Sequence, residues 1–75
     1  MKDKEYIRLL EIIADNVKKM REGKNLSQFD LALKADCSRN QISRIENQDV
    51  NPSIFLLSKI ASALETTVLK LLSKE

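Results

Sequence analysis

The sequence of 75 residues contains no histidine, no tryptophan and a single cysteine. Because histidine and cysteine supply most ligands of zinc and other transition metals, this composition argues against a metal site. It also offers no nucleophile with a partner base, so we expect no enzymatic activity and no cofactor. The cysteine, Cys37, could act as a redox switch, but we interpret it as a small apolar side chain that packs in a turn.

Glycine and proline are equally scarce, with one of each in the chain. A glycine-rich phosphate-binding loop is therefore excluded. Leucine, isoleucine, alanine, lysine and glutamate are abundant and no strand-like alternation occurs, which predicts an all-α fold. A single domain of residues 1–75 buries only about 60% of its unfolded surface, so association with a second copy would add stability to a small core.

No apolar stretch is long enough to cross a membrane and no secretion signal is present, so we expect a cytoplasmic, nucleoid-associated protein. The net charge is only +2. Basic residues nevertheless gather before and within residues 27–47, a distribution that fits an ordinary solvated surface as well as a nucleic-acid-binding one. They are Lys18, Lys19, Arg21, Lys24, Lys34, Arg39 and Arg44.

Residues 27–47 contain two predicted helix starts. Ser27 and Ser38 are good N-caps, and each precedes apolar residues at helical spacing. Two starts this close imply two short helices joined by a tight turn. Small residues in the first helix let the second cross it at close range, as a helix-turn-helix requires. The predicted buried residues of the first helix are Leu31, Ala32 and Ala35.

The second of these helices has two faces when its residues are projected at about 100° each. Ile42 and Ile45 fall on the inward face, and polar residues occupy the opposite one. Arginine can bind O6 and N7 of guanine together, and asparagine can bind N6 and N7 of adenine. The first turn of such a helix enters the major groove most deeply. The predicted base-reading residues are Arg39, Asn40, Ser43 and Arg44.

A longer pattern surrounds these helices: Ser27, Gln28, Leu31, Ala32, Ile42, Ile45, Glu46, Asn47, Asn51, Pro52 and Ser53. It resembles the pattern of the Cro/repressor-type, or XRE-like, helix-turn-helix family, with its spacing intact, and the similarity covers residues 13–72. The resemblance implies a five-helix, lambda-repressor-like DNA-binding domain with double-stranded operator DNA as its partner.

The resemblance also implies roles for individual residues. Gln28 would touch a phosphate and brace the recognition helix, while Arg21 and Glu46 would form a structural ion pair between the first and third helices. Base reading would belong to Arg39, Asn40 and Arg44. The predicted phosphate and positioning residues are Gln28, Lys24, Lys34 and Gln41.

The chain departs from the family pattern at several turns. Asn25 and Asp36 stand where a left-handed glycine is common, a conformation that both residue types tolerate. Gln48 and Asp49 replace a frequent glycine and a basic residue. Because a negative charge near DNA is unfavourable, Asp49 argues against a phosphate contact by this side chain.

Phe29 and Leu33 are apolar at positions of the second helix where the family usually shows polar residues. They are four residues apart, so they form a pair on the outer side of the helix. Either the extended first helix or a partner chain covers them, or they are simply exposed.

The flanking helices are predicted over residues 1–21, with an end near Glu22 or Gly23, over residues 53–64 and over residues 68–73. The first begins earlier than the family needs. Thr66 or Thr67 caps the fifth. The fourth inserts these residues into the core: Phe55 or Leu56, Leu57, Ile60, Ala61 and Leu64. Surplus apolar residues near the chain's end predict a two-fold dimer interface that sets two recognition helices about 34 Å apart. Its predicted residues are Leu64, Val68, Leu69 and Leu72.

These features predict a transcription regulator that binds palindromic operators as a homodimer, with no small-molecule effector because the chain leaves no room for an effector domain. Its small size and early first helix resemble the controller proteins of restriction-modification systems. A phage Cro-like repressor or a plasmid regulator fits as well. An antitoxin or adaptor that mainly binds a protein partner is the alternative from another class, supported by Phe29, Leu33 and Leu69.

Overall fold

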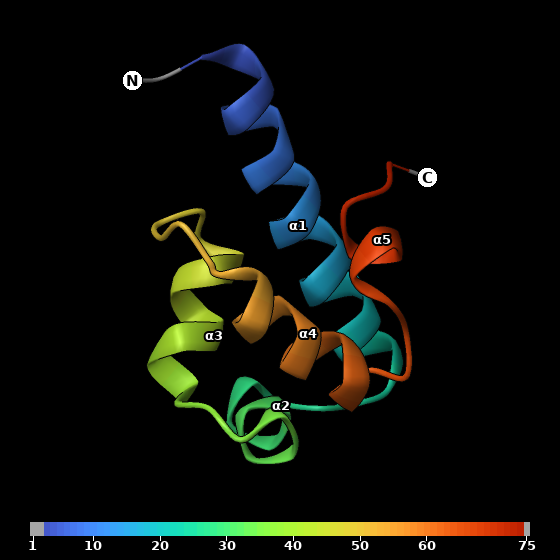
Figure 1. Cartoon of the computed structure of the whole chain (residues 1–75). Coiled ribbons are helices and arrows are strands. Elements are labelled where there is room, and N and C mark those ends of the chain that lie inside the picture. The colour runs from blue at the N-terminus through green and yellow to red at the C-terminus, as the bar shows by residue number, and fades with distance from the viewer. Residues whose placement is uncertain (1–2, 75) are drawn as a thin grey trace.

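The computed structural model describes residues 3–74, and these form five helices with no strand among them. The predicted all-α fold is therefore confirmed. The early turns of the long first helix extend beyond the other helices, and the four shorter helices gather around its second half (Figure 1). The helices are α1 (Lys4–Gly23), α2 (Gln28–Ala35), α3 (Arg39–Glu46), α4 (Ile54–Ala63) and α5 (Val68–Leu71).

Each helix begins after a polar N-cap whose side chain accepts a hydrogen bond from a backbone N–H in the first turn. Ser27 and Ser38 take this role as predicted, and each forms a reciprocal capping box. The first helix begins after Asp3, later than predicted, and ends at Gly23, where its end was predicted; the predicted residues 1–2 lie outside the described part of the chain. The cap of α5 is Thr67 rather than Thr66, and α5 ends at Leu71.

The core receives a fully buried side chain from every helix. These side chains are Val17, Leu31, Ile42, Ile60 and Leu71. Burying each of them contributes about 1.5–3 kcal/mol relative to leaving it exposed. Of the two residues considered for the start of α4, Leu56 enters the core and Phe55 is 73% exposed. Helix α3 packs against α2 and α1, and α4 packs against α2, so α3 is held in place from two sides.

The prediction that Leu64 lies in a dimer interface is wrong. Leu64 is only 3% exposed, because the chain turns away after α4 and buries this side chain against its own core. It therefore has no surface to offer a partner. Leu69 is 76% exposed, and Val68 and Leu72 are half-buried.

One side chain of α1 forms hydrogen bonds with the end of the short helix α5. Asn16 Nδ2 lies within hydrogen-bond distance of the carbonyl oxygens of Lys70, Leu71 and Ser73, at 3.2, 2.9 and 2.9 Å. These are carbonyls at a helix end, where the helix itself supplies no donors. Asn16 thus positions the surface that carries Leu69.

Four helix ends are closed by a left-handed residue, and none of the four is glycine: Asn25, Asp36, Gln48 and Glu65 have φ between 56° and 60°. Asn25 and Asp36 were predicted to adopt this conformation, and both do. In each case the following residue donates its N–H back to a carbonyl in the last turn, the hydrogen bond of a Schellman motif. The motif forms at these ends although a side chain with a Cβ carries a conformational penalty there.

This penalty leads to a stability prediction at Gln48. A left-handed conformation costs an L-residue about 1–2 kcal/mol, and the extra unfolded-state entropy of glycine offsets about 0.5–1 kcal/mol of that. Gln48→Gly should therefore raise the free energy of unfolding by about 0.5–1 kcal/mol in urea denaturation. Gln48→Ala keeps the Cβ and serves as the control. Equal stability of the two variants would contradict the argument.

No helix within residues 3–74 has an apolar stretch of the length needed to span a bilayer.

Candidate nucleic-acid interface

The helix-turn-helix unit is formed by α2, a tight turn and α3. Asp36 reverses the chain in the left-handed conformation, and its N–H and that of Cys37 close the end of α2. Ala32 and Ala35 are 3% and 2% exposed, so α3 approaches α2 across small side chains, as predicted. Ile42 and Ile45 anchor α3 from behind, with exposures of 0% and 2%.

The outward face of α3 carries the predicted base-reading residues. Arg39 and Asn40 are exposed and occupy its first turn, immediately after the Ser38 cap. Ser43 is half-buried, and its Oγ accepts a 3.5 Å hydrogen bond from Asn47 Nδ2. Arg44 stands one turn further along and its side chain is half exposed. The face therefore offers a polar surface to solvent while its opposite side is sealed in the core.

A cluster of three side chains ties α3 to α1 and α2. Arg21 Nε and Nη2 donate to the two carboxylate oxygens of Glu46, at 2.7 and 3.0 Å, so the predicted ion pair is present and bidentate. Gln28 Nε2 donates to Glu46 Oε1 at 3.0 Å, which braces the recognition helix as predicted. Arg21 also donates to the carbonyl of Leu26 at 2.8 Å.

The Arg21–Glu46 pair is nearly withdrawn from solvent, since the two side chains are only 10% and 5% exposed. The hydrogen bond to Glu46 raises the pKa of Arg21 above its usual value, against the opposing effect of burial. The buried guanidinium of Arg21 thus depends on the Glu46 carboxylate to compensate its charge.

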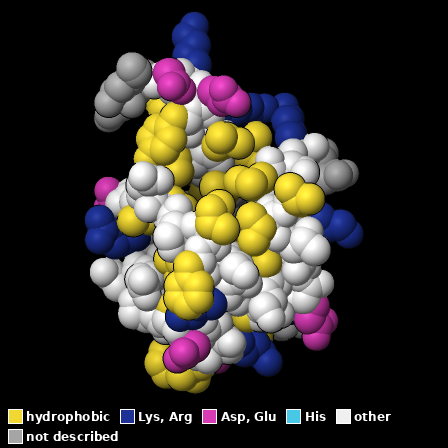
Figure 2. Space-filling view, viewed as in Figure 1, with side chains coloured by type: hydrophobic (Ala, Val, Ile, Leu, Met, Phe, Trp, Pro, Cys, Tyr) yellow, Lys and Arg dark blue, Asp and Glu magenta, His cyan; other side chains and the backbone are white. Residues whose placement is uncertain are grey.

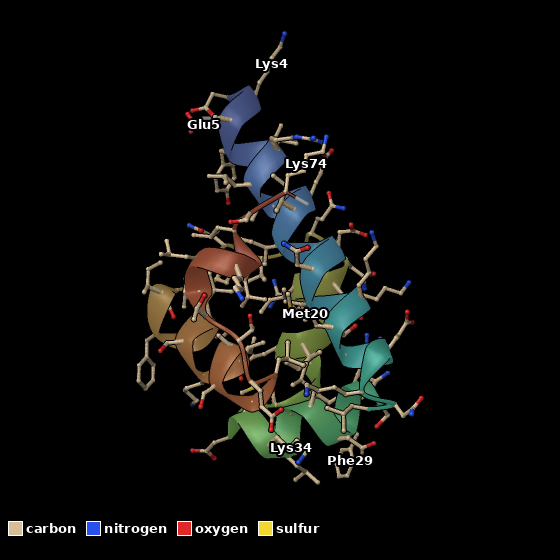
Figure 3. The ribbon with its side chains drawn as sticks, turned by 90° about the vertical axis from the view of Figure 1, so that its right-hand side faces the viewer. Lys4, Glu5, Met20, Phe29, Lys34 and Lys74 are labelled. Atoms are coloured by element: carbon tan, nitrogen blue, oxygen red, sulfur yellow. The ribbon has the colours of Figure 1, made fainter. Side chains whose placement is uncertain are left out.

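The remaining predicted phosphate residues occupy different places. Gln41 Oε1 accepts from the backbone N–H of Ser38 at 2.9 Å, so this side chain closes the capping box of α3. Lys24 and Lys34 line a hollow with Glu65 that includes no residue of α3, and Lys24 Nζ lies 3.0 Å from Glu65 Oε1. Lys34 projects outward from the α2 end of the molecule, where Phe29 also projects (Figure 3). The structure thus separates these lysines from the outward face of α3.

Two carboxylates here have a pKa below their ordinary value. At Asp30 the main causes are hydrogen bonds from the backbone and side chain of Ser27, and at Glu65 the main cause is the hydrogen bond from Lys24. The pKa of the Cys37 thiol is raised, chiefly by burial. Because the thiolate is the reactive form, a raised pKa favours the structural interpretation of this half-buried cysteine over a redox switch.

Some features of this region were not predicted. The loop after α3 returns to the helix, and Arg44 Nη2 donates to the carbonyl of Asp49 at 3.2 Å. Beside it, Arg44, Phe55 and Lys59 line a hollow between α3 and α4, with Lys59 Nζ 5.1 Å from the Phe55 ring centre. The exposure of Phe55 was one of two predicted outcomes, since only one of the neighbours Phe55 and Leu56 was expected in the core. No feature of the sequence predicted the contact between Arg44 and Asp49.

Comparisons with known proteins agree with this geometry. Residues 17–71 match the family model described as helix-turn-helix. The chain is 36% identical over 70 residues to control protein C.SmaI of Serratia marcescens, and this match covers 93% of the chain and 83% of that protein.

Solved structures of similar proteins share the fold. The hypothetical transcription factor NHTF from Neisseria has a TM-score of 0.84 and 29% identity, over 87% of this chain and 75% of that one. The wild-type restriction-modification controller protein C.Esp1396I has a TM-score of 0.76 and 32% identity, over 89% of this chain and 95% of that one.

Proposed function

Because the chain belongs to the helix-turn-helix family and is a DNA-binding transcription regulator, we propose that α3 lies in the major groove and reads base edges there. One observation carries this proposal. Arg39 and Asn40 are exposed in the first turn of α3, the part that enters the groove most deeply. Ser43 and Arg44 extend the same face by one turn, and we assign base contacts to all four residues.

Phosphate contacts would fix the register of the protein on DNA without reading its sequence. Gln28 and Gln41 stand at the first turns of α2 and α3, where backbone N–H groups also point outward. We assign Gln41 a phosphate contact through Nε2, and Gln28 one through the second N–H of Nε2, which Glu46 does not accept. Lys24 and Lys34 lie around the hollow at Glu65. We therefore propose that they attract DNA over a longer range, an effect that salt screens.

The proposal includes a homodimer. Figure 2 shows hydrophobic side chains gathered over the face where α1, α4 and α5 meet. Ile7, Ile54 and Leu69 are large apolar residues of these three helices with exposures of 41%, 65% and 76%. Soluble monomers rarely expose a contiguous apolar area of this kind. We propose that a second copy covers it through a two-fold axis, with Val68 and Leu72 at its edge in addition to Leu69.

Leu69→Glu tests the dimer. A charge placed on the apolar face should leave the fold intact, because Leu69 is exposed, and shift the protein from dimer to monomer at micromolar concentration in sedimentation experiments. Leu33→Glu is the matched control, since Leu33 is 66% exposed on α2 and lies outside the proposed interface. Dimerisation that survives Leu69→Glu, or that is lost only with Leu33→Glu, would contradict this interface.

Selection of bound sequences from random DNA tests the function as a whole. A two-fold dimer with one recognition helix per half-site should select an inverted repeat whose half-sites lie about 34 Å apart, one turn of DNA. A directly repeated or single half-site would contradict the dimer geometry, and the absence of any enriched sequence would contradict base reading.

We further propose that the protein controls expression within a restriction-modification system, because its relatives include the control protein C.SmaI. Genes for a methyltransferase and an endonuclease beside its own gene would support this.

Phe29 and Leu33, 58% and 66% exposed on α2, favour a second candidate, an antitoxin or adaptor that holds a protein partner. A neighbouring toxin gene would favour that candidate. If Phe29→Glu and Leu33→Glu together change neither stability nor oligomeric state, the pair is simply exposed.

A further inference from the structure

The loop residue Asp49 meets Arg44 through both its backbone and its side chain. Its carbonyl oxygen accepts a hydrogen bond from Arg44 Nη2 at 3.2 Å, and its Oδ2 lies 3.9 Å from Arg44 Nε. Its backbone N–H donates to the Arg44 carbonyl at 2.8 Å. Arg44 is therefore both the attachment point of the loop and the cation that the loop holds.

The position of Asp49 is set by the backbone rather than by the attraction between the two charges. Gln48 has a φ of 60°, and its N–H donates to the carbonyl of Ile45 at 3.1 Å, so the chain folds back onto α3. On its other side the loop borders a hollow of about 310 Å³ that it shares with Tyr6, Ile7 and Leu10 of α1. The early turns of α1, which the family pattern does not require, thus flank this loop.

The loop leaves a particular part of the guanidinium free. Asp49 occupies the edge formed by Nε and Nη2, whereas a guanidinium has five N–H donors and a second edge formed by Nη1 and Nη2. That second edge can still bind O6 and N7 of a guanine. An arginine held along one edge is ordered before it meets DNA, which reduces the entropy lost on binding.

Asp49 has the opposite effect on sequence-independent binding. A long, unattached arginine can bind any phosphate within reach, and phosphate contacts supply most of the affinity for DNA of arbitrary sequence. Asp49 competes with phosphates for Arg44, and its carboxylate, 75% exposed, repels the DNA backbone.

We propose that Asp49 is a specificity-determining residue: it orders Arg44 for a base edge and withholds it from phosphates. It therefore lowers affinity for arbitrary DNA more than affinity for the operator. This inference rests on the proposed reading of DNA by α3.

Asp49→Asn tests the proposal, because asparagine keeps the backbone hydrogen bonds and removes the charge. The probe is a mixed-sequence duplex, with binding followed by fluorescence anisotropy over a salt series. We expect affinity to rise about three- to tenfold at low salt, with the salt slope steeper by about 0.9 for each additional phosphate that the variant neutralises. The operator found by selection should show a smaller rise in affinity, so the ratio of specific to non-specific affinity should fall.

Two further variants isolate the cause. In the Arg44→Ala background, Asp49→Asn should raise affinity for the mixed-sequence duplex no more than the loss of one exposed negative charge does, since no arginine is released. Asp15→Asn removes an exposed carboxylate of α1 that pairs with Lys19 at 3.1 Å, and controls for net charge. An equal rise in affinity with Asp15→Asn, or a rise of full size that persists without Arg44, would overturn the proposal. Failure of the wild-type protein to bind any duplex would instead overturn the proposed function.

Discussion

Arg21→Ala is expected to lower the free energy of unfolding by about 3–5 kcal/mol, the usual cost of removing one partner of a buried ion pair. The reason is the charge that remains. Glu46 would keep a carboxylate that is 5% exposed, with Gln28 as its neutral donor. Arg21 also satisfies the carbonyl of Leu26, which the variant leaves without this donor. Because a domain of this size has a total stability of about 5–10 kcal/mol, the loss should be visible in any denaturation curve.

Two comparisons test whether the loss of stability comes from the burial of the Arg21–Glu46 pair or from the loss of any ion pair. Lys19→Ala removes the exposed pair with Asp15, whose atoms are also close at 3.1 Å, and should cost less than about 1 kcal/mol. Replacing both buried partners, as Arg21→Met with Glu46→Leu, should restore much of the lost stability, since no charge remains unpaired. A loss of less than about 1 kcal/mol for Arg21→Ala would show that Glu46 is readily hydrated and that the pair does not hold α3 in place.

Arg39→Ala is expected to weaken operator binding by about 1–3 kcal/mol for each half-site, the cost of one bidentate base contact. A dimer loses this contact twice, so affinity for a two-fold operator should fall by about 2–6 kcal/mol in total. The residue is exposed, so the fold should not change. Selection from random DNA with the variant should show relaxed preference at one base pair of each half-site.

The matched control is Arg8→Ala, which removes the same charge from the surface of α1, where Arg8 Nη1 lies 3.5 Å from Glu11 Oε1. It should reduce the affinity for all DNA slightly and equally, through net charge alone. If Arg39→Ala behaved in this way, with equal losses on operator and mixed-sequence DNA, Arg39 would be a phosphate contact and not a reader of bases.

The sequence predicted the features that depend on local rules. Serine caps at Ser27 and Ser38, the small crossing residues Ala32 and Ala35, and the inward pair Ile42 and Ile45 all follow from spacing and side-chain type. The Arg21–Glu46 pair required the family resemblance, because nothing local connects residues in separate helices. The structure confirms its geometry at 2.7 Å.

The features that the sequence did not predict depend on where the chain turns in three dimensions. Leu64 was predicted both in the core and at a partner interface, because residue spacing alone did not decide between them; its exposure of 3% places it in the core. Asp49 meets Arg44 because Gln48 adopts the left-handed conformation without being glycine, which residue type alone does not indicate. Lys24 was predicted beside DNA, and its pairing with Glu65 depends on the left-handed turn at Glu65.

Methylation interference on the selected operator tests the central claim, that the outward face of α3 reads the major groove. Methylation of guanine N7 blocks the acceptor that an arginine fork uses in that groove. We expect methylation of one guanine in each half-site to prevent binding of the wild-type protein. The same methylation should not further weaken binding of the Arg39→Ala variant. Binding that tolerates N7 methylation throughout the operator, and is blocked only by adenine N3 methylation in the minor groove, would contradict the account.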